Sequence, residues 1–149
     1  MLDGAATSNL ITEPDSSWTV PWLLAERIDR DPQSTIIERK SPLGNSWVAV
    51  SARSFGEDVA RIASGLMGLG LEQGQAVSIM AHTSYEWTLL DMAIARAGLV
   101  SVPIYETDSA EQIEWILADA QVRLVVTESV ALAHVVRQAA DAFRAAHPQ

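Results

Sequence analysis

Between Ser54 and Thr127, the hydrophobic positions alternate between two spacings. Apolar residues first recur every three or four positions with charged residues between them, and then form a short continuous run rich in Val and Ile. The first spacing is typical of a helix with one buried face, and the second of a buried strand. Three such helix-then-strand units follow one another. This pattern predicts a three-layer α/β fold, in which right-handed crossovers place helices over a mainly parallel sheet.

The parallel strands are expected at Val77 to Ala81, Val100 to Tyr105 and Leu124 to Thr127. Pro103 lies inside the second of them and has no amide hydrogen for a sheet ladder. That strand is therefore expected to lie at an edge of the sheet, or to lose its regular pairing at Pro103.

The helix ends carry their own signals. Ser54 and Glu57 have the spacing of a capping box, in which two side chains satisfy amide groups at a helix start. Glycines that accept a positive φ, and short polar side chains that accept from amide groups, mark the remaining ends. These are Gly70 and Gly98 as terminators, Thr83 or Ser84 as the second cap, and Asp108 or Ser109 as the third.

The flanks of this region are simpler. Residues 1–17 lack periodicity and are expected to form a loose tail, so that 18–149 is the folded part. A short helix from Thr19 to Asp31 is followed by an antiparallel hairpin of Ile36 to Arg39 and Ser46 to Val50, joined by turn residues. The segment after Thr127 is expected to be helical up to Ala146.

Composition excludes several classes of function. With 149 residues, the chain has the length of one domain and can bury a sizeable core. Its 19 acidic and 10 basic residues give a net charge of −9, and no nucleic-acid partner is expected because phosphate binding needs clustered cations. The chain has no cysteine, no basic-then-apolar leader and no long apolar run, which favours a cytoplasmic protein.

The apolar share of 48% exceeds what an acidic domain of this length needs for its own core. We therefore expect an apolar patch that stays uncovered, at the sheet edge or on the Ala-rich last helix. Self-association is the expected consequence of such a patch.

His82 is the polar residue with the most suggestive position. It follows a predicted central strand, at the edge where open parallel sheets bind ligands, and Thr83, Ser84 and the next helix start offer donors to an anion. A histidine in such a turn can instead be a hydrogen-bonded turn residue. The sequence leaves both interpretations open.

The acidic residues nearby are equally ambiguous. Glu106 and Asp108 follow the next strand and could hold a metal, but one acid that caps a helix accounts for this pair as well. Glu86 fits the first turn of a helix, where negative charge is favourable.

The other candidate residues do not indicate a functional site. Gly68, Gly70 and Gly74 close a helix instead of opening one, so they do not form a dinucleotide loop. The aromatic residues Tyr85, Trp87 and Trp115 accompany apolar stripes and are expected in the core or in an interface, and His134 and His147 have no partners at metal-ligand spacing. On this basis the sequence assigns no catalytic, cofactor-binding or metal-binding residue.

The run from Trp47 to Ser129 resembles the opening of the AMP-forming adenylating enzymes, and most of all the bacterial long-chain fatty acid CoA ligases. The order and spacing of four motifs carry the resemblance: Tyr85-Glu86-Trp87, Ala97-Gly98, Val102-Pro103-Ile104-Tyr105 and Ser109-Ala110-Glu111-Gln112. It extends over about residues 18 to 140, which is most of this chain but only the first part of a typical family member. The sequence departs from the family at Gln75-Ala76, a turn where the family usually has an Asp followed by a basic residue.

The resemblance implies a parent enzyme that joins a fatty acid to coenzyme A with ATP and Mg²⁺, by way of an acyl-adenylate. The residues that do this in the family are a Ser/Thr/Gly-rich phosphate loop, later nucleotide motifs and a lysine on a C-terminal domain, and none has a counterpart here. The chain would therefore be an inactive N-terminal subdomain that binds no cofactor. Its partners would be the rest of the adenylating domain and the C-terminal domain.

A rival hypothesis is a freestanding α/β module that binds a small ligand or has a regulatory role. Such a module would use the strand ends at His82 and Glu106 as its site. A Ser/Thr/Gly-rich phosphate loop encoded downstream would exclude it.

Overall fold

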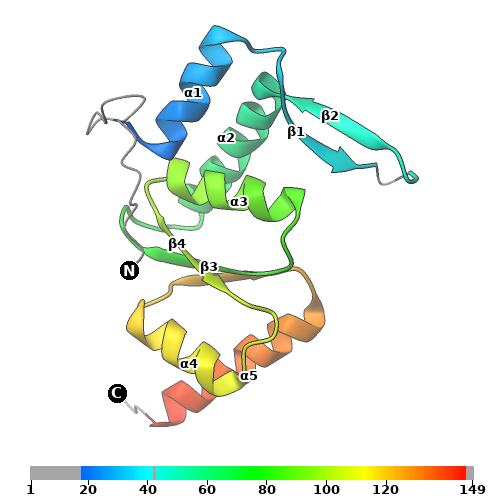
Figure 1. The fold of residues 1–149 in the computed structure, drawn as a ribbon. Helices are drawn as coiled ribbons and strands as arrows, with labels where there is room; N and C mark the ends of the chain where they lie inside the picture. The colour runs from blue at the N-terminus through cyan, green and yellow to red at the C-terminus, as the bar shows by residue number, and fades with distance from the viewer. Residues whose placement is uncertain (1–17, 42, 147–149) are drawn as a thin grey trace, which may run out of the picture.

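A computed structural model describes residues 18–41 and 43–146 of the chain (Figure 1). The predicted tail, Pro42 of the hairpin turn and His147 lie outside the described residues. The elements in chain order are α1 (Val20–Arg30), β1 (Thr35–Lys40), β2 (Trp47–Ser51), α2 (Ala52–Gly68), β3 (Ala76–Met80), α3 (Tyr85–Arg96), β4 (Val100–Ile104), α4 (Ala110–Asp119), β5 (Leu124–Thr127) and α5 (Val130–Ala146). None of these helices is long and apolar enough to cross a bilayer.

The parallel sheet has the strand order β4-β3-β5. Strand β3 pairs in parallel with both neighbours, Val77 lying opposite Ser101 on one side and opposite Leu124 on the other. The three predicted parallel strands are thereby confirmed, with bounds that differ by no more than one residue at each end. Strands β1 and β2 form a separate antiparallel hairpin, as predicted.

Pro103 lies on an edge strand, because β4 has β3 as its only neighbour among the described strands. The register continues past it, with Pro103 opposite Ile79 and Ile104 opposite Met80. The edge alternative is therefore confirmed, and the alternative in which pairing ends at Pro103 is wrong. A proline is tolerated here because its missing amide faces away from the sheet.

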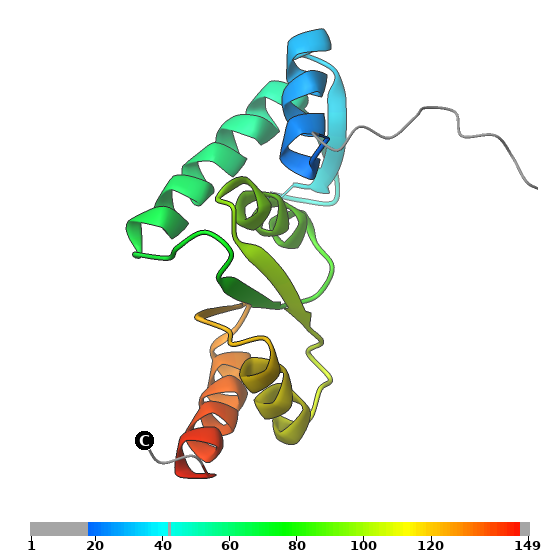
Figure 2. The ribbon, with the colours of Figure 1, turned by 90° about the vertical axis from the view of Figure 1, so that its left-hand side faces the viewer.

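Helices cover both faces of the sheet and give three layers (Figures 1 and 2). On one face, which we call the α3 face, side chains of α1, α2 and α3 pack on Val77 and Ile79. On the opposite face, the α5 face, Ile113 of α4 and Ala139 of α5 pack on Met80 and Ile104. Because successive strand residues point to opposite faces, β3 contributes to both cores, and all five of its residues are buried.

Helix α2 begins earlier than its capping signal indicated. Ser51, not Ser54, is the N-cap, and its Oγ accepts from the amide of Ser54 at 3.2 Å. The first two amides of the helix donate outside it, Ala52 to the Ser34 carbonyl and Arg53 to the Pro32 carbonyl, both at 3.0 Å. Since the loop before β1 satisfies these amides, the helix starts directly where β2 ends.

The other helix ends follow their sequence signals. Ser84 caps α3, and Ser109 with Gln112 forms a complete capping box at the start of α4. Gly70 and Gly98 take positive φ values of 79° and 74° after α2 and α3, a conformation that costs least without a Cβ.

Leu66 and Leu69 provide a matched test of the α3-face core. Leu66 is 6% exposed inside this core, whereas Leu69, the C-cap of the same helix, is 67% exposed. We expect Leu66→Ala to lower the free energy of unfolding by about 2 to 5 kcal/mol, because it leaves a cavity. Leu69→Ala should change it by less than about 0.5 kcal/mol. Urea denaturation of both variants checks this, and equal losses would contradict the packing described.

Candidate functional site

The connections of the sheet diverge at its carboxyl end. The chain leaves β3 for α3 on one face, whereas it leaves β5 for α5 on the other (Figure 1). Strands β3 and β5 are neighbours, so their outgoing turns separate at this point. Such a switch point is where open parallel sheets bind ligands. A ligand site on this sheet is therefore expected at this point.

A hollow of about 380 Å³ lies at this point, and we call it the switch-point hollow. Ile79 of β3, Val126 of β5 and Trp87 and Leu90 of α3 contribute its apolar lining. Ser84, Glu86 and Glu128 contribute polar side chains. The hollow combines an apolar surface with negative charge.

His82 bridges the turns that follow all three parallel strands. Its Nδ1 lies 2.5 Å from Oε1 of Glu128, in the turn after β5, and its Nε2 lies 3.1 Å from Oε1 of Glu106, in the turn after β4. The backbone amide of His82 also donates to Oε2 of Glu128 at 2.9 Å. We refer to these three residues as the His82 bridge.

The electrostatics of the bridge favour a charged imidazole. The hydrogen bond to Glu128 raises the pKa of His82 above its ordinary value of 6.5, and the charges of Glu106 and Glu128 add to the effect. The pKa of Glu128 is lowered, first by the hydrogen bond from the His82 amide and then by the bond from the ring. Each partner thus stabilises the ionised form of the other.

The structure supports the interpretation of His82 as a turn residue, whereas neither Glu106 nor Asp108 caps α4, because its N-cap is Ser109. His82 is a hydrogen-bonded turn residue, and with a carboxylate at each ring nitrogen it is poorly placed to hold an anion. Glu106 pairs with His82, while Asp108 accepts from the amide of Tyr105 at 3.0 Å. In the described part of the chain, no group of three His, Asp or Glu residues is arranged to hold a metal ion.

The three aromatic candidates differ in their surroundings. Tyr85 and Trp87 pack against the α3-face core, and the Tyr85 hydroxyl donates to Asp58 at 3.3 Å. Burial and the nearby charge of Asp58 raise the pKa of Tyr85. Trp115 is 66% exposed, so the core alternative is wrong for this residue and the interface alternative stays a prediction. It lies two positions after the buried Ile113, which turns it to the opposite side of a short helix.

Glu128 is the site residue that the sequence reasoning missed. It directly follows β5, as His82 and Glu106 follow their own strands by two positions. A polar residue after each of three parallel strands was a signal for proximity, because these ends share one edge of the sheet. The spacing along the chain did not show that β5 lies beside β3.

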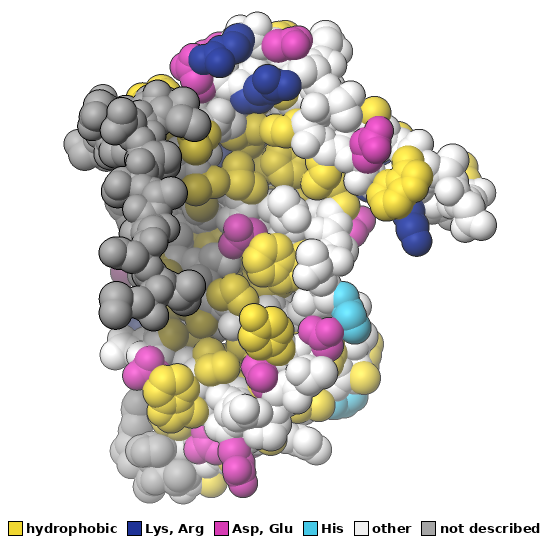
Figure 3. Space-filling view, viewed as in Figure 1, with side chains coloured by type: hydrophobic (Ala, Val, Ile, Leu, Met, Phe, Trp, Pro, Cys, Tyr) yellow, Lys and Arg dark blue, Asp and Glu magenta, His cyan; other side chains and the backbone are white. Residues whose placement is uncertain are grey.

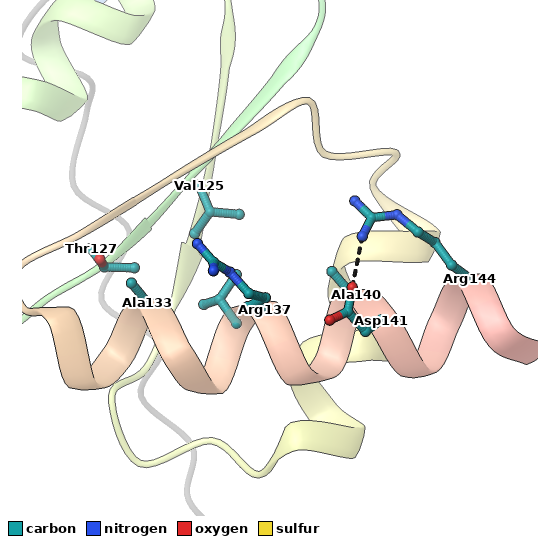
Figure 4. A pocket seen from close by; sticks show the side chains of 8 residues that line it. Val125, Thr127, Ala133, Arg137, Ala140, Asp141 and Arg144 are labelled. Atoms are coloured by element: carbon teal, nitrogen blue, oxygen red, sulfur yellow. Dashed lines mark hydrogen bonds and ion pairs between the residues drawn. The ribbon is translucent and has the colours of Figure 1, made fainter.

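A second hollow, of about 350 Å³, follows the free edge of β5 (Figure 4). Val125 and Thr127 of the strand face Ala133, Arg137 and Ala140 of α5 across it. Arg144 binds Asp141 at 2.8 Å at one end of this hollow. Among the described strands, β5 pairs only with β3, so the second edge of the sheet is open here.

The AMP-binding enzyme family matches residues 24–148, which include all the elements from β1 onward and the whole His82 bridge. The chain belongs to this family. The long-chain-fatty-acid–CoA ligase FadD15 of Mycobacterium bovis is 38% identical over 99 residues. That match covers 66% of this chain and 16% of the relative, so the chain spans a small part of the length of this ligase.

Solved structures share the fold of the chain. A fatty acyl CoA synthetase of Mycobacterium tuberculosis superposes with a TM-score of 0.65 at 25% identity, over 84% of this chain and 23% of that one. A putative long-chain-fatty-acid CoA ligase of Rhodopseudomonas palustris superposes with a TM-score of 0.70 at 22% identity, over 84% and 30%. The fold is that of the N-terminal part of these enzymes.

Ser84 positions the α3 end of the switch-point hollow, and its substitution tests this. Its Oγ accepts from the amide of Trp87 at 3.0 Å, so Ser84→Ala should lower the free energy of unfolding by about 1 kcal/mol. The control is Ser64→Ala, inside α2, where the hydroxyl donates only to the Ala60 carbonyl and Ala is the better helix former. Thermal denaturation should show a loss for the first variant and none for the second, and the reverse order would contradict the cap.

Proposed function

We propose that this chain is the N-terminal scaffold portion of a long-chain fatty acid CoA ligase. The observation that carries the proposal is the 38% identity to FadD15, which falls on the N-terminal part of that ligase. The superposition on a fatty acyl CoA synthetase over 84% of the chain supports it. In this proposal residues 1–17 are a tail, and 18–149 form one N-terminal subdomain.

The parent enzyme would convert a fatty acid, ATP and coenzyme A into acyl-CoA, AMP and pyrophosphate. ATP, Mg²⁺ and coenzyme A would be cofactors of the parent, and the rest of the adenylating domain and a C-terminal domain would be the partners of this chain. We place the parent in the cytoplasm, at the membrane periphery where its fatty acid substrate is found.

The residues around the switch-point hollow do not fit the phosphates of ATP. Glu86, Glu106 and Glu128 bring three carboxylates to this region. Both ring nitrogens of His82 already face carboxylates, and Lys40, the single lysine of the chain, lies on the separate hairpin. Transfer of a phosphate-bound group depends on preorganised positive charge. We therefore assign no catalytic, cofactor-binding or metal-binding residue to this chain and derive no step through ATP.

The contribution of the chain to the parent enzyme would be structural. Strand β3 and the helices on both faces form a prepacked sheet with open edges at β4 and β5. An open strand edge presents amide and carbonyl groups that another segment can pair with. The nucleotide-binding and acyl-binding parts of the parent would be built on this layer.

The comparisons favour the ligase over the freestanding module. The switch-point hollow lies at the strand ends that the module would use, but the matching relatives and structures named above are acyl-CoA ligases. Binding of a small ligand to the isolated chain therefore forms no part of the proposal.

Catalytic silence of the isolated chain is the direct test of the proposal. Residues 1 to 149 incubated with ATP, Mg²⁺, a long-chain fatty acid and labelled pyrophosphate should show no exchange above buffer, and coenzyme A should yield no thioester. The reason is that positioning and preorganised charge supply most of the rate of such a reaction. Intact FadD15, assayed in parallel, is the positive control.

Two outcomes would contradict this assignment. Exchange that copurifies with the chain and is lost in His82→Ala would show that an active module has been taken for a scaffold. Exchange that persists in His82→Ala, and that still copurifies with the chain on a second, unrelated column, would also contradict the predicted lack of activity.

Self-association is a second expectation of the scaffold. Large apolar side chains are exposed on the described surface, among them Val100 on edge strand β4, Trp115 on α4 and Val130 at the start of α5. Figure 3 shows apolar side chains gathered over the middle of one face, from α1 down to α4. Sedimentation velocity at rising concentration should show a growing average mass, and a constant monomer mass together with no binding of an apolar dye would contradict it.

A further inference from the structure

The His82 bridge joins segments that are far apart in the sequence. His82 and Glu128 are 46 residues apart, and Glu106 comes from a third turn. The bridge spans the point where the turns after β3 and β5 separate, and Glu128 also lines the switch-point hollow. The bridge therefore ties the turns after all three parallel strands together at one edge of the sheet.

A neutral His82 ring cannot donate a hydrogen bond to both of its carboxylate partners. A carboxylate is only an acceptor, and a neutral imidazole has one N–H donor and one lone pair. Nδ1 and Nε2 each face a carboxylate oxygen, at 2.5 Å and 3.1 Å. Only an imidazolium, with two N–H groups, satisfies both contacts. The neutral ring leaves one carboxylate against a lone pair.

Glu106 is the partner that the neutral ring releases. Glu128 is held twice, by Nδ1 and by the backbone amide of His82 at 2.9 Å, and this amide does not titrate. Glu106 is held by His82 through Nε2 alone. The remaining proton of a neutral ring is therefore kept at Nδ1, between the ring and Glu128.

The turn that carries Glu106 is closed by local hydrogen bonds. The amide of Tyr105 donates to the Asp108 side chain and the amide of Asp108 donates to the Tyr105 carbonyl, both at 3.0 Å. These two bonds close the turn on itself, without any help from His82. Without the contact at Nε2 the turn depends on such local bonds, so it opens more often and its amides exchange faster.

We propose that His82 is a proton-dependent latch: as an imidazolium it holds the turn after β4 against the turns after β3 and β5, and as a neutral ring it releases that turn. The charged groups acting on His82 are Glu106 from the turn after β4 and Glu128 from the turn after β5. Glu86 of α3 lines the switch-point hollow together with Glu128. Glu106 and Glu128 are both acidic, and both favour the closed, protonated state.

The direction of the pH dependence follows from the two shifts. The pKa of His82 is raised, so its contribution to stability is complete below the ordinary value of 6.5 and is lost as the pH rises through the value in the folded protein. The pKa of Glu128 is lowered from 4.5, so its contribution is present above that value and is lost on acidification. The latch is therefore closed in mildly acidic solution and opens on the alkaline side of 6.5.

NMR titration of the histidine ring signals tests the latch on the whole chain. The midpoint of His82 should move to lower pH in Glu106→Gln and in Glu128→Gln, with the larger shift in Glu128→Gln because Glu128 makes the strongest contact. The matched control is Glu57→Gln, on the exposed surface of α2, which should leave the midpoint unchanged. A midpoint that is the same in the wild type and in Glu106→Gln would overturn the proposal.

Amide hydrogen exchange distinguishes a latch from a histidine that has only a structural role. After correction for the intrinsic effect of pH, protection at residues 105–109 should fall as the pH passes the His82 midpoint, while β3 stays protected. In His82→Gln, which cannot become charged, protection of the turn should be low and should not follow the pH. Protection of 105–109 that is equal on both sides of the midpoint in the wild type would overturn the latch.

Discussion

Burial of β3 between two layers of helices is the constraint on which the rest of the structure depends. All five residues of this strand are buried, and they alternate between the α3-face core and the α5-face core. Both neighbouring strands take their register from it. Because one strand belongs to two cores, neither layer of helices can pack without it. The edges at β4 and β5 remain available for further structure.

This arrangement fits the proposed role of the segment as a scaffold. A prepacked sheet fixes the positions of its strand ends, and those ends are where open parallel sheets carry ligands. In this chain the strand ends carry carboxylates around a histidine, which disfavours phosphate at that place. The segment thus supplies geometry, and the groups for adenylation have to come from elsewhere in the proposed parent.

The sequence predicts the sheet well and its polar contacts poorly, for physical reasons. The predicted bounds of the parallel strands lie within one residue of the observed ones, because a short continuous apolar run between two helical patterns is typical of a buried strand. The start of α2 was misplaced, because Ser51 and Ser54 are both plausible caps and the Pro32 and Ser34 carbonyls decide between them. The pairing of His82 with Glu128 requires β5 to lie beside β3, and periodicity does not fix that order. The apolar neighbourhood of Trp115 predicted a place in the core or in an interface, and the helix turns this side chain outward, which excludes the core.

Native-state hydrogen exchange at the amides of β3 tests the central claim most directly. If β3 is the strand that both cores share, the amides of Val77, Ile79 and Met80 should exchange only through global unfolding, with an opening free energy equal to that from denaturation. The amides of the β1–β2 hairpin should exchange through smaller, local openings. Equal protection of the hairpin and β3, or local opening of β3 well below the global value, would contradict the account.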